Sequence, residues 1–347
     1  MKLIKIAETF IEKIRRDYAD DVSLVVVMGS YVFDEIHDRS DLDMFYVPKT
    51  DRGYNLGFTF IIDEIGFDLW PISWERLSGI AHHKERITSI VTDGMILYSS
   101  SPEDLRRFEE LKEAARNTLD RKECMERAAA VFSESYRLIY RLQSQISLSG
   151  VRREGILLLN NIAHTLSLLN GTPIRRGRSK LKKEVMEMRL VPEDFPLLYD
   201  TVFFSDKIDD IRNDLLQLMK NTEKLVQDEK DSLLKKSSVK DVFDGFFEEL
   251  INYYNKIEHA YEINDPLTCL FAACEIHEEI DHALCYSDLK SFMLPDILAA
   301  YDPENLEKIL ITSREHKARF TTLLESYGVT IRRFRDEAEF EKHLDSL

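Results

Sequence analysis

The spacing of apolar side chains changes near residue 115, and this change constrains the fold more than any other feature. Before that point, short apolar runs such as 24–28 and 95–99 are separated by turn-forming residues, a pattern typical of β-strands. After it, glycines are scarce and apolar residues recur at helical spacing. We therefore expect an α+β protein: a small mixed β-sheet domain with flanking helices over 1–115, then an all-helical region over 116–347. The charged stretch 227–241 is the expected division of the helical region.

Local signals place the remaining elements. A strand is expected over 41–47, ended by Pro48, and two more within 57–73 with a turn at Glu64–Gly66. Ser73 and Ser101 are N-cap residue types, and Asn170-Gly171 is a C-cap signal. Helices are expected over 1–20, from Ser73, from Ser101, and over 120–149, 153–169, 206–230, 239–262, 266–285, 303–312 and 313–327.

The formal net charge of −16 argues against long nucleic-acid partners, because duplex binding neutralises many phosphates. It would suit a small cationic ligand, although acidic surfaces also serve solubility. No apolar run reaches the 18 residues of a membrane span. The first residues lack a signal-peptide pattern, and the four cysteines form no Cys-x-x-Cys pair. We therefore expect a cytoplasmic protein with reduced thiols and no membrane partner.

Asp41 and Asp43 flank Leu42 in the second apolar run. On a strand they would share one face, about 7 Å apart, with Leu42 on the other. Two such carboxylates repel each other unless a cation lies between them, and Mg²⁺ prefers oxygen ligands of this kind. The alternative is an edge strand that carries two solvated acids.

Asp68 lies among Phe67, Leu69 and Trp70, where an isolated charge is costly. If its strand lies beside the Asp41 strand, a third acid joins the pair, and three acids can hold two divalent cations for phosphoryl displacement. A structural ion pair is the alternative. Asp63 and Glu64 are rival acids near the expected turn.

Gly29-Ser30 follows a buried strand and precedes a short helical turn. A glycine there allows backbone N–H groups to approach phosphate oxygens, and the Ser30 hydroxyl adds a donor. A plain turn or helix cap is the alternative.

The order strand, Gly-Ser, Asp-x-Asp on a strand, then a lone Asp on a later strand resembles the DNA polymerase β-like nucleotidyltransferase superfamily. "SDLDMFYV" looks like the form of its small-molecule branch, which includes aminoglycoside and lincosamide nucleotidyltransferases. The resemblance implies that Gly29 and Ser30 bind the nucleotide. It also implies that Asp41, Asp43 and Asp68 are the catalytic, metal-binding carboxylates.

The segment "TPIRRGRSKLKKE", residues 172–184, is the strongest basic cluster of the chain. Phosphoryl transfer needs cations where charge accumulates, and Arg178 and Lys180 are the preferred nucleotide-binding pair. An exposed loop between helices is an equally good interpretation.

Glu134 is a candidate for a general base. His277 with Asp281, and Glu278 with His282, have the spacing of a helical metal face but are more typical of a polar helix surface.

These residues predict an enzyme that moves a nucleoside monophosphate, with ATP the expected donor and one or two Mg²⁺ ions bound, to a hydroxyl of a small molecule. The resemblance implies an antibiotic of the aminoglycoside or lincosamide type as the acceptor, which would be cationic, and antibiotic resistance as the matching role; the sequence leaves the acceptor and the role in resistance open. Transfer to a protein or RNA, and a regulatory protein that binds nucleotide without turnover, are the alternatives. The sequence leaves the oligomeric state open.

Overall fold

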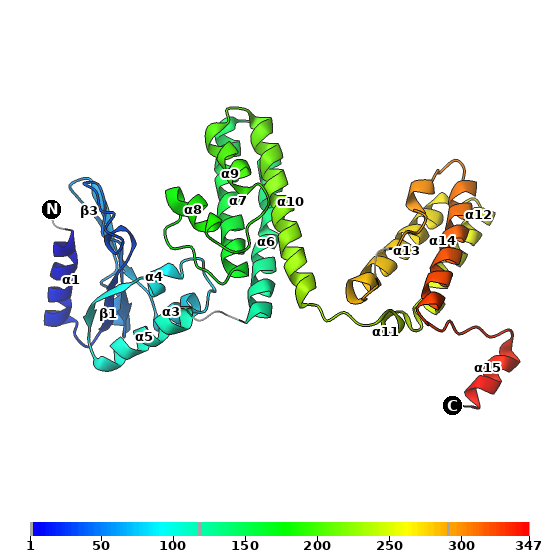
Figure 1. Cartoon of the computed structure of the whole chain (residues 1–347). Coiled ribbons are helices and arrows are strands. Elements are labelled where there is room, and N and C mark those ends of the chain that lie inside the picture. Colours follow the sequence, from blue (N-terminus) through cyan, green and yellow to red (C-terminus); the bar gives the residue numbers. More distant parts are fainter. Residues whose placement is uncertain (1–2, 117–119, 290–291, 347) are drawn as a thin grey trace. The chain divides into compact units, whose positions relative to one another are not determined.

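The computed structural model describes residues 3–116, 120–289 and 292–346. The chain forms two compact units, residues 1–230 and 231–347 (Figure 1), called here the N-terminal and C-terminal units. The expected domain boundary at residue 115 stays a prediction, since both sides of it lie within the N-terminal unit. None of the described helices combines the length and the apolar character that a membrane crossing requires.

A five-stranded sheet begins the N-terminal unit, in the order β3-β4-β2-β1-β5. Strands β2 and β4 are parallel, and the other neighbouring pairs are antiparallel. The strands are β1 (Val22–Val27), β2 (Met44–Pro48), β3 (Thr59–Ile62), β4 (Ile65–Pro71) and β5 (Met95–Ser99).

Helices cover both faces of this sheet, which explains why every residue of β1 is buried. Val25 and Val27 pack with the apolar side of α1 (Ile4–Asp17). Leu24 and Val26 face the opposite way and pack with the helices of the other side. Those helices are α3 (Trp74–Ala81), α4 (Ser89–Thr92) and α5 (Pro102–Arg116), and the short α2 (Asp51–Tyr54) follows β2.

Two strand boundaries differ from the prediction. Strand β2 begins at Met44 rather than at Asp41 and includes Pro48. The expected turn at Glu64–Gly66 is instead formed by Asp63 and Glu64, both with positive φ (52° and 62°), and Gly66 lies within β4. Two central residues with positive φ are what a tight hairpin between twisted strands requires.

The predicted helix caps are confirmed. The Ser73 side chain accepts a hydrogen bond from the Arg76 N–H at the start of α3, and Ser101 Oγ accepts one from the Asp104 N–H at the start of α5 (both 3.1 Å). Asn170 is the C-cap of α7 (Leu148–Leu169), and Gly171 follows with φ of 58°.

A helical bundle completes the N-terminal unit around one core. Helices α6 and α7 pack against each other and are joined by α9 and α10. The bounds are α6 (Arg121–Gln143), α7 (Leu148–Leu169), η2 (Arg178–Lys180), α8 (Leu181–Met186), α9 (Phe195–Phe204) and α10 (Ile208–Leu233).

The C-terminal unit corrects two helix predictions. The helix expected over 239–262 is broken at Gly245, whose φ of +76° is not helical. The helices expected over 303–312 and 313–327 are one helix, in which Ser313 is buried. The elements are α11 (Val239–Phe243), α12 (Phe246–Glu262), α13 (Pro266–Tyr286), η3 (Leu298–Ala300), α14 (Glu307–Ser326) and α15 (Glu337–Leu344). The α+β class, with a mostly helical C-terminal region, is confirmed.

Phe108 on α5 provides a test of this packing. Its side chain is fully buried, and its ring centroid lies 6.2 Å from that of Phe45 on β2. Phe108→Ala should cost about 3 to 5 kcal/mol of unfolding free energy in the sheet region. Both tryptophans, Trp70 and Trp74, lie in that region, so urea unfolding followed by tryptophan fluorescence measures the loss. Leu105→Ala is the control, because this residue of the same helix is 42% exposed; an equal loss in both variants would contradict the packing.

Candidate active site

The Gly29-Ser30 turn touches the Asp-x-Asp segment directly. Gly29 follows β1 with φ of +67° and opens a short 3₁₀ turn. A Cβ atom built on Gly29 would lie 2.1 Å from Oδ2 of Asp43, so the Asp43 carboxylate rests against the glycine backbone. Only glycine accepts both this conformation and this approach.

Asp41 and Asp43 precede β2 but keep the alternation of a strand. Both are exposed, whereas Leu42 and Met44 are buried. The Met28 N–H donates to the Asp43 carbonyl (2.9 Å), which continues the pairing of β1 with β2. The two carboxylates therefore share one face, as predicted, although the strand itself starts later.

The electrostatics of Asp43 join it to two other predicted site residues. Asp43 is exposed as a residue, but protein atoms displace water from part of its carboxylate. This desolvation and the negative charge of Asp41 raise the pKa of Asp43, whereas the nearby Arg178 guanidinium lowers it. Two acids and one arginine thus act on one another at the end of the sheet.

Asp68 lies on the neighbouring parallel strand. Met44 pairs with Leu69, so Asp43 and Asp68 are level with each other on strands about 5 Å apart. Asp68 is exposed between buried Phe67 and Leu69. The register thus puts Asp68 on the same face of the sheet as Asp41 and Asp43. The rival Asp63 lies in the hairpin turn, five residues along from Asp68 and about 15 Å away on an extended chain.

The donor set of these three residues fits a hard divalent cation. Carboxylate oxygens are the ligands that Mg²⁺ prefers, and the mutual repulsion of Asp41 and Asp43 is what a bound cation would relieve. Within the described ranges, no group of three His, Cys, Asp or Glu side chains is drawn together closely enough to hold an ion by itself. Asp41 and Asp43 would be the ligands, with Asp68 beside them and substrate oxygens completing the shell.

The basic loop, residues 172–180, is held in shape by an acid. The Glu184 carboxylate accepts hydrogen bonds from three successive backbone N–H groups, those of Arg175 (2.6 Å), Arg176 (2.9 Å) and Gly177 (2.9 Å). Gly177 and Arg178 both have positive φ (57° and 45°). This is an ordered turn rather than a loose connection.

The basic loop packs on the residues that follow Gly29-Ser30. The Arg176 guanidinium lies 4.2 Å from the centre of the Phe33 ring and forms an ion pair with Glu35. Lys180 lies 3.8 Å from the same Glu35 carboxylate. Arg175 forms two hydrogen bonds to Asp93 (2.6 and 2.8 Å). These contacts hold the loop that carries Arg178, whose charge acts on Asp43.

Two adjoining pockets open beside this loop, and together they are called the arginine cleft. The first, about 280 Å³, is lined by Arg86, by Arg175, Arg176 and Arg178 of the basic loop, and by Asn160 and His164 of α7. The second, about 230 Å³, shares Arg86, Asn160 and His164 and adds Glu134, Arg137 and Arg141 of α6. Sequence reasoning missed Arg86 and His164, because neither belongs to a recognisable motif.

Glu134 does line this cleft, but its environment disfavours a role as base. Arg137 Nε donates a hydrogen bond to Glu134 (2.7 Å), and this hydrogen bond lowers the pKa of the Glu134 carboxyl. A carboxylate with a lowered pKa is a weaker base.

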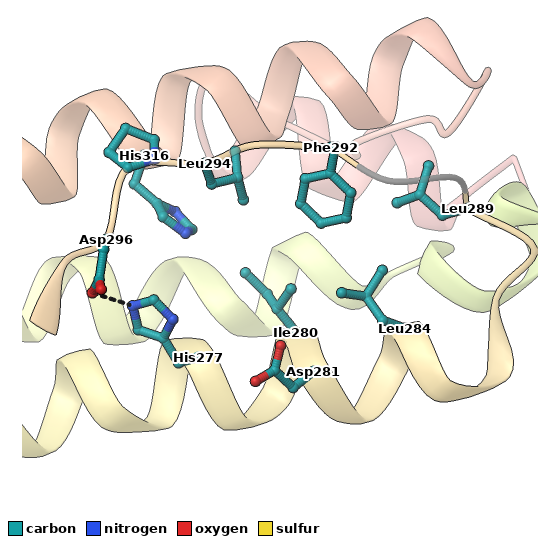
Figure 2. A pocket seen from close by; sticks show the side chains of 10 residues that line it. His277, Ile280, Asp281, Leu284, Leu289, Phe292, Leu294, Asp296 and His316 are labelled. Carbon is teal, nitrogen blue, oxygen red and sulfur yellow. Dashed lines mark ion pairs between the residues drawn. The ribbon is translucent and has the colours of Figure 1, made fainter. Parts of the chain in front are cut away.

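A separate pocket of about 460 Å³ lies in the C-terminal unit (Figure 2). His277 and Asp281 of α13 point into it, beside Asp296 and beside His316 of α14. His277 Nε2 lies 3.8 Å from Asp296, and the Tyr254 hydroxyl shares a 2.7 Å hydrogen bond with Nδ1 of His316. In the part of the chain that the structure describes, no metal-binding group forms here. The pocket lining combines these polar side chains with apolar ones such as Ile280, Leu284 and Phe292.

Gly29→Ala tests the contact with Asp43. The added methyl group must displace the Asp43 carboxylate and hold a strained φ, at a cost of about 1 to 3 kcal/mol. Urea unfolding followed by tryptophan fluorescence measures this loss. The matched control is Gly66→Ala, where a Cβ would meet nothing within 4 Å; similar stability of the two variants would show that the close approach is wrong.

His316 should make stability depend on pH. It is 1% exposed, and burial lowers its pKa to about 4, below the ordinary value of about 6.5. The unfolded chain therefore binds the proton more tightly, so stability is full above pH 6.5 and about 3 kcal/mol is lost by pH 4. Urea unfolding by circular dichroism at several pH values should show a shallower pH dependence for His316→Gln. Identical slopes would refute the assignment.

Comparisons with known proteins add little to this geometry. No family model and no curated protein sequence matches the chain. Among solved structures, it is similar to the crystal structure of a nucleotidyltransferase-like protein from Exiguobacterium sibiricum, with a TM-score of 0.39 and 15% identity over 64% of this chain and 75% of that one. A likeness at this TM-score carries no weight for function, which has to be inferred from the residues themselves.

Proposed function

We propose that the chain is a magnesium-dependent nucleotidyltransferase that moves AMP from ATP to a hydroxyl group of a small molecule and releases pyrophosphate. The observation that carries this proposal is the contact of the Asp43 carboxylate with Gly29, with Arg178 close enough to lower the pKa of Asp43. This arrangement brings together a glycine turn suited to phosphate binding, a pair of acids and an arginine, which come from three separate segments.

The phosphates would lie between the Gly29-Ser30 turn and the basic loop. Backbone N–H groups of a glycine turn and the Ser30 hydroxyl can donate to phosphate oxygens. Among the described residues, Arg178 forms no ion pair with a carboxylate, so its guanidinium is available to a phosphate. Lys180 shares the Glu35 carboxylate with Arg176, so it would add positive charge that Glu35 only partly compensates.

In the reaction, the acceptor oxygen attacks the α-phosphorus, and the bond from that phosphorus to the bridging oxygen of the β-phosphate breaks. Pyrophosphate leaves with this oxygen, and the acceptor proton passes to a carboxylate. Asp68 is suited to accept this proton, because it is level with Asp43 and no described side chain pairs with it. Bound Mg²⁺, held by Asp41 and Asp43, would supply positive charge to the phosphate oxygens.

The acids can be tested by substitution. Asp41→Asn and Asp43→Asn should each lower pyrophosphate release about 1,000-fold or more, because several kcal/mol of charge stabilisation disappear. A coupled pyrophosphate assay with ATP, Mg²⁺ and an acceptor panel measures the rate. Asp63→Asn removes the rival acid in the hairpin turn, where asparagine tolerates the positive φ, and should leave the rate unchanged.

Other results would redirect the proposal. Full activity of Asp41→Asn or Asp43→Asn would overturn it. Calorimetry that detects ATP and Mg²⁺ binding without pyrophosphate release on any acceptor would favour a regulatory protein. A mass increase of one AMP on a partner protein would favour transfer to protein.

A further inference from the structure

The arginine cleft indicates the charge of the acceptor. We propose that the acceptor bears an anionic group, a phosphate or a carboxylate, which binds at the end of the cleft formed by α6. This inference rests on the proposed function, because it assigns the second substrate of the same reaction.

The cleft has two ends with different neighbours. At one end is Arg178, whose charge acts on Asp43, where the nucleotide phosphates are proposed to bind. At the other end, Arg137 and Arg141 project from α6. Arg86 lines both pockets and therefore links the two ends. A molecule in the second pocket would thus have the nucleotide site as its neighbour.

The charges of the lining are mostly positive. The first pocket has four arginines and no acid, and the second has three arginines against Glu134. Two arginines of the first pocket are neutralised nearby, Arg175 by Asp93 and Arg176 by Glu35. In the described part of the chain, Arg86 forms no ion pair, so its charge is uncompensated at the point where the pockets meet.

The α6 end keeps an excess of positive charge after its ion pairs are counted. Glu134 pairs with Arg137. The fully buried Glu154 is shared by Arg141 and by Arg153, its neighbour outside the pocket lining. One carboxylate cannot neutralise two guanidinium groups, and a partly satisfied arginine retains donors for a further anion.

The uncharged members of the lining suit a polar ligand. Burial, Arg86 and His83 lower the pKa of His164, so its imidazole is neutral near pH 7 and can donate or accept a hydrogen bond. Asn160 donates its amide N–H to the Ile156 carbonyl (2.9 Å), which leaves its side-chain oxygen for a ligand hydroxyl. An anionic molecule with hydroxyl groups would match both features.

The net charge of −16 favours a cationic ligand, but that charge is spread over the whole chain. Charges beyond about 8 Å are largely screened at physiological ionic strength. A ligand in the cleft therefore responds to its arginines rather than to the distant acids. The arginines of the cleft would repel a polycationic aminoglycoside.

The test compares matched acceptors and one matched pair of variants. Pyrophosphate release with ATP and Mg²⁺ is measured with ribose 5-phosphate, gluconate, ribose and kanamycin, which carry a phosphate, a carboxylate, no charge and positive charge. We expect release only with one or both of the anionic compounds, and the comparison of these two compounds distinguishes phosphate from carboxylate.

Arg137→Gln should raise the KM for the active anionic acceptor about 10-fold and leave the KM for ATP unchanged. Lys122→Gln removes a positive charge from the same helix outside the cleft and should change neither.

A binding measurement separates this inference from the proposed function. Ribose 5-phosphate and gluconate are each titrated into the full chain in a calorimeter. The titration is done once with the chain saturated with a non-hydrolysable ATP analogue and Mg²⁺, and once without them. Binding that Arg137→Gln weakens about 10-fold, without any pyrophosphate release, would support the anion site and count against nucleotidyl transfer. Release with ribose or kanamycin at equal efficiency, or anion binding that Arg137→Gln leaves unchanged, would overturn the inference.

Discussion

The contact between the Asp43 carboxylate and the Gly29 backbone is the constraint on which the candidate site depends. It requires a residue without a side chain after β1 and an acid immediately before β2, and the pairing of these two strands fixes both. Because β4 runs parallel to β2 in a defined register, Asp68 then falls level with Asp43. The basic loop completes the arrangement from the helical side. Backbone pairing therefore places the three sheet segments together, and side-chain contacts with Phe33, Glu35 and Asp93 add the basic loop.

Much of this arrangement follows from the sequence. Short apolar runs predict the strands, serines predict the helix starts, and the Gly-Ser and Asp-x-Asp motifs identify the two segments that touch. The start of β2 could not be predicted, because an extended residue outside the ladder has the same alternation as one within it. The break at Gly245 could have been read from the glycine itself, a poor helix residue. The continuity of α14 depends on tertiary packing, since Ser313 is buried within it.

The arginine cleft, the proposed acceptor site, shows why composition is a poor guide to the charge of a pocket. Arg137 and Arg141 lie four residues apart on α6, and Arg86 lies far earlier in the chain, so no single segment of the sequence is basic enough to predict this cluster. Only the fold brings their guanidinium groups to one cleft. The strong basic cluster of the sequence, by contrast, uses part of its charge on Asp93 and Glu35 to hold its own position.

Glu184 gives the basic loop a property that its arginines alone would lack. Its carboxylate accepts hydrogen bonds from three consecutive backbone N–H groups. The backbone of the loop is therefore ordered before any anion binds. A loop that is already ordered loses little conformational entropy on binding. The same loop without this acid would keep its arginines but would lose more conformational entropy on binding a phosphate, and would therefore bind it more weakly. The affinity of an anion site can therefore depend on a carboxylate that makes no contact with the anion.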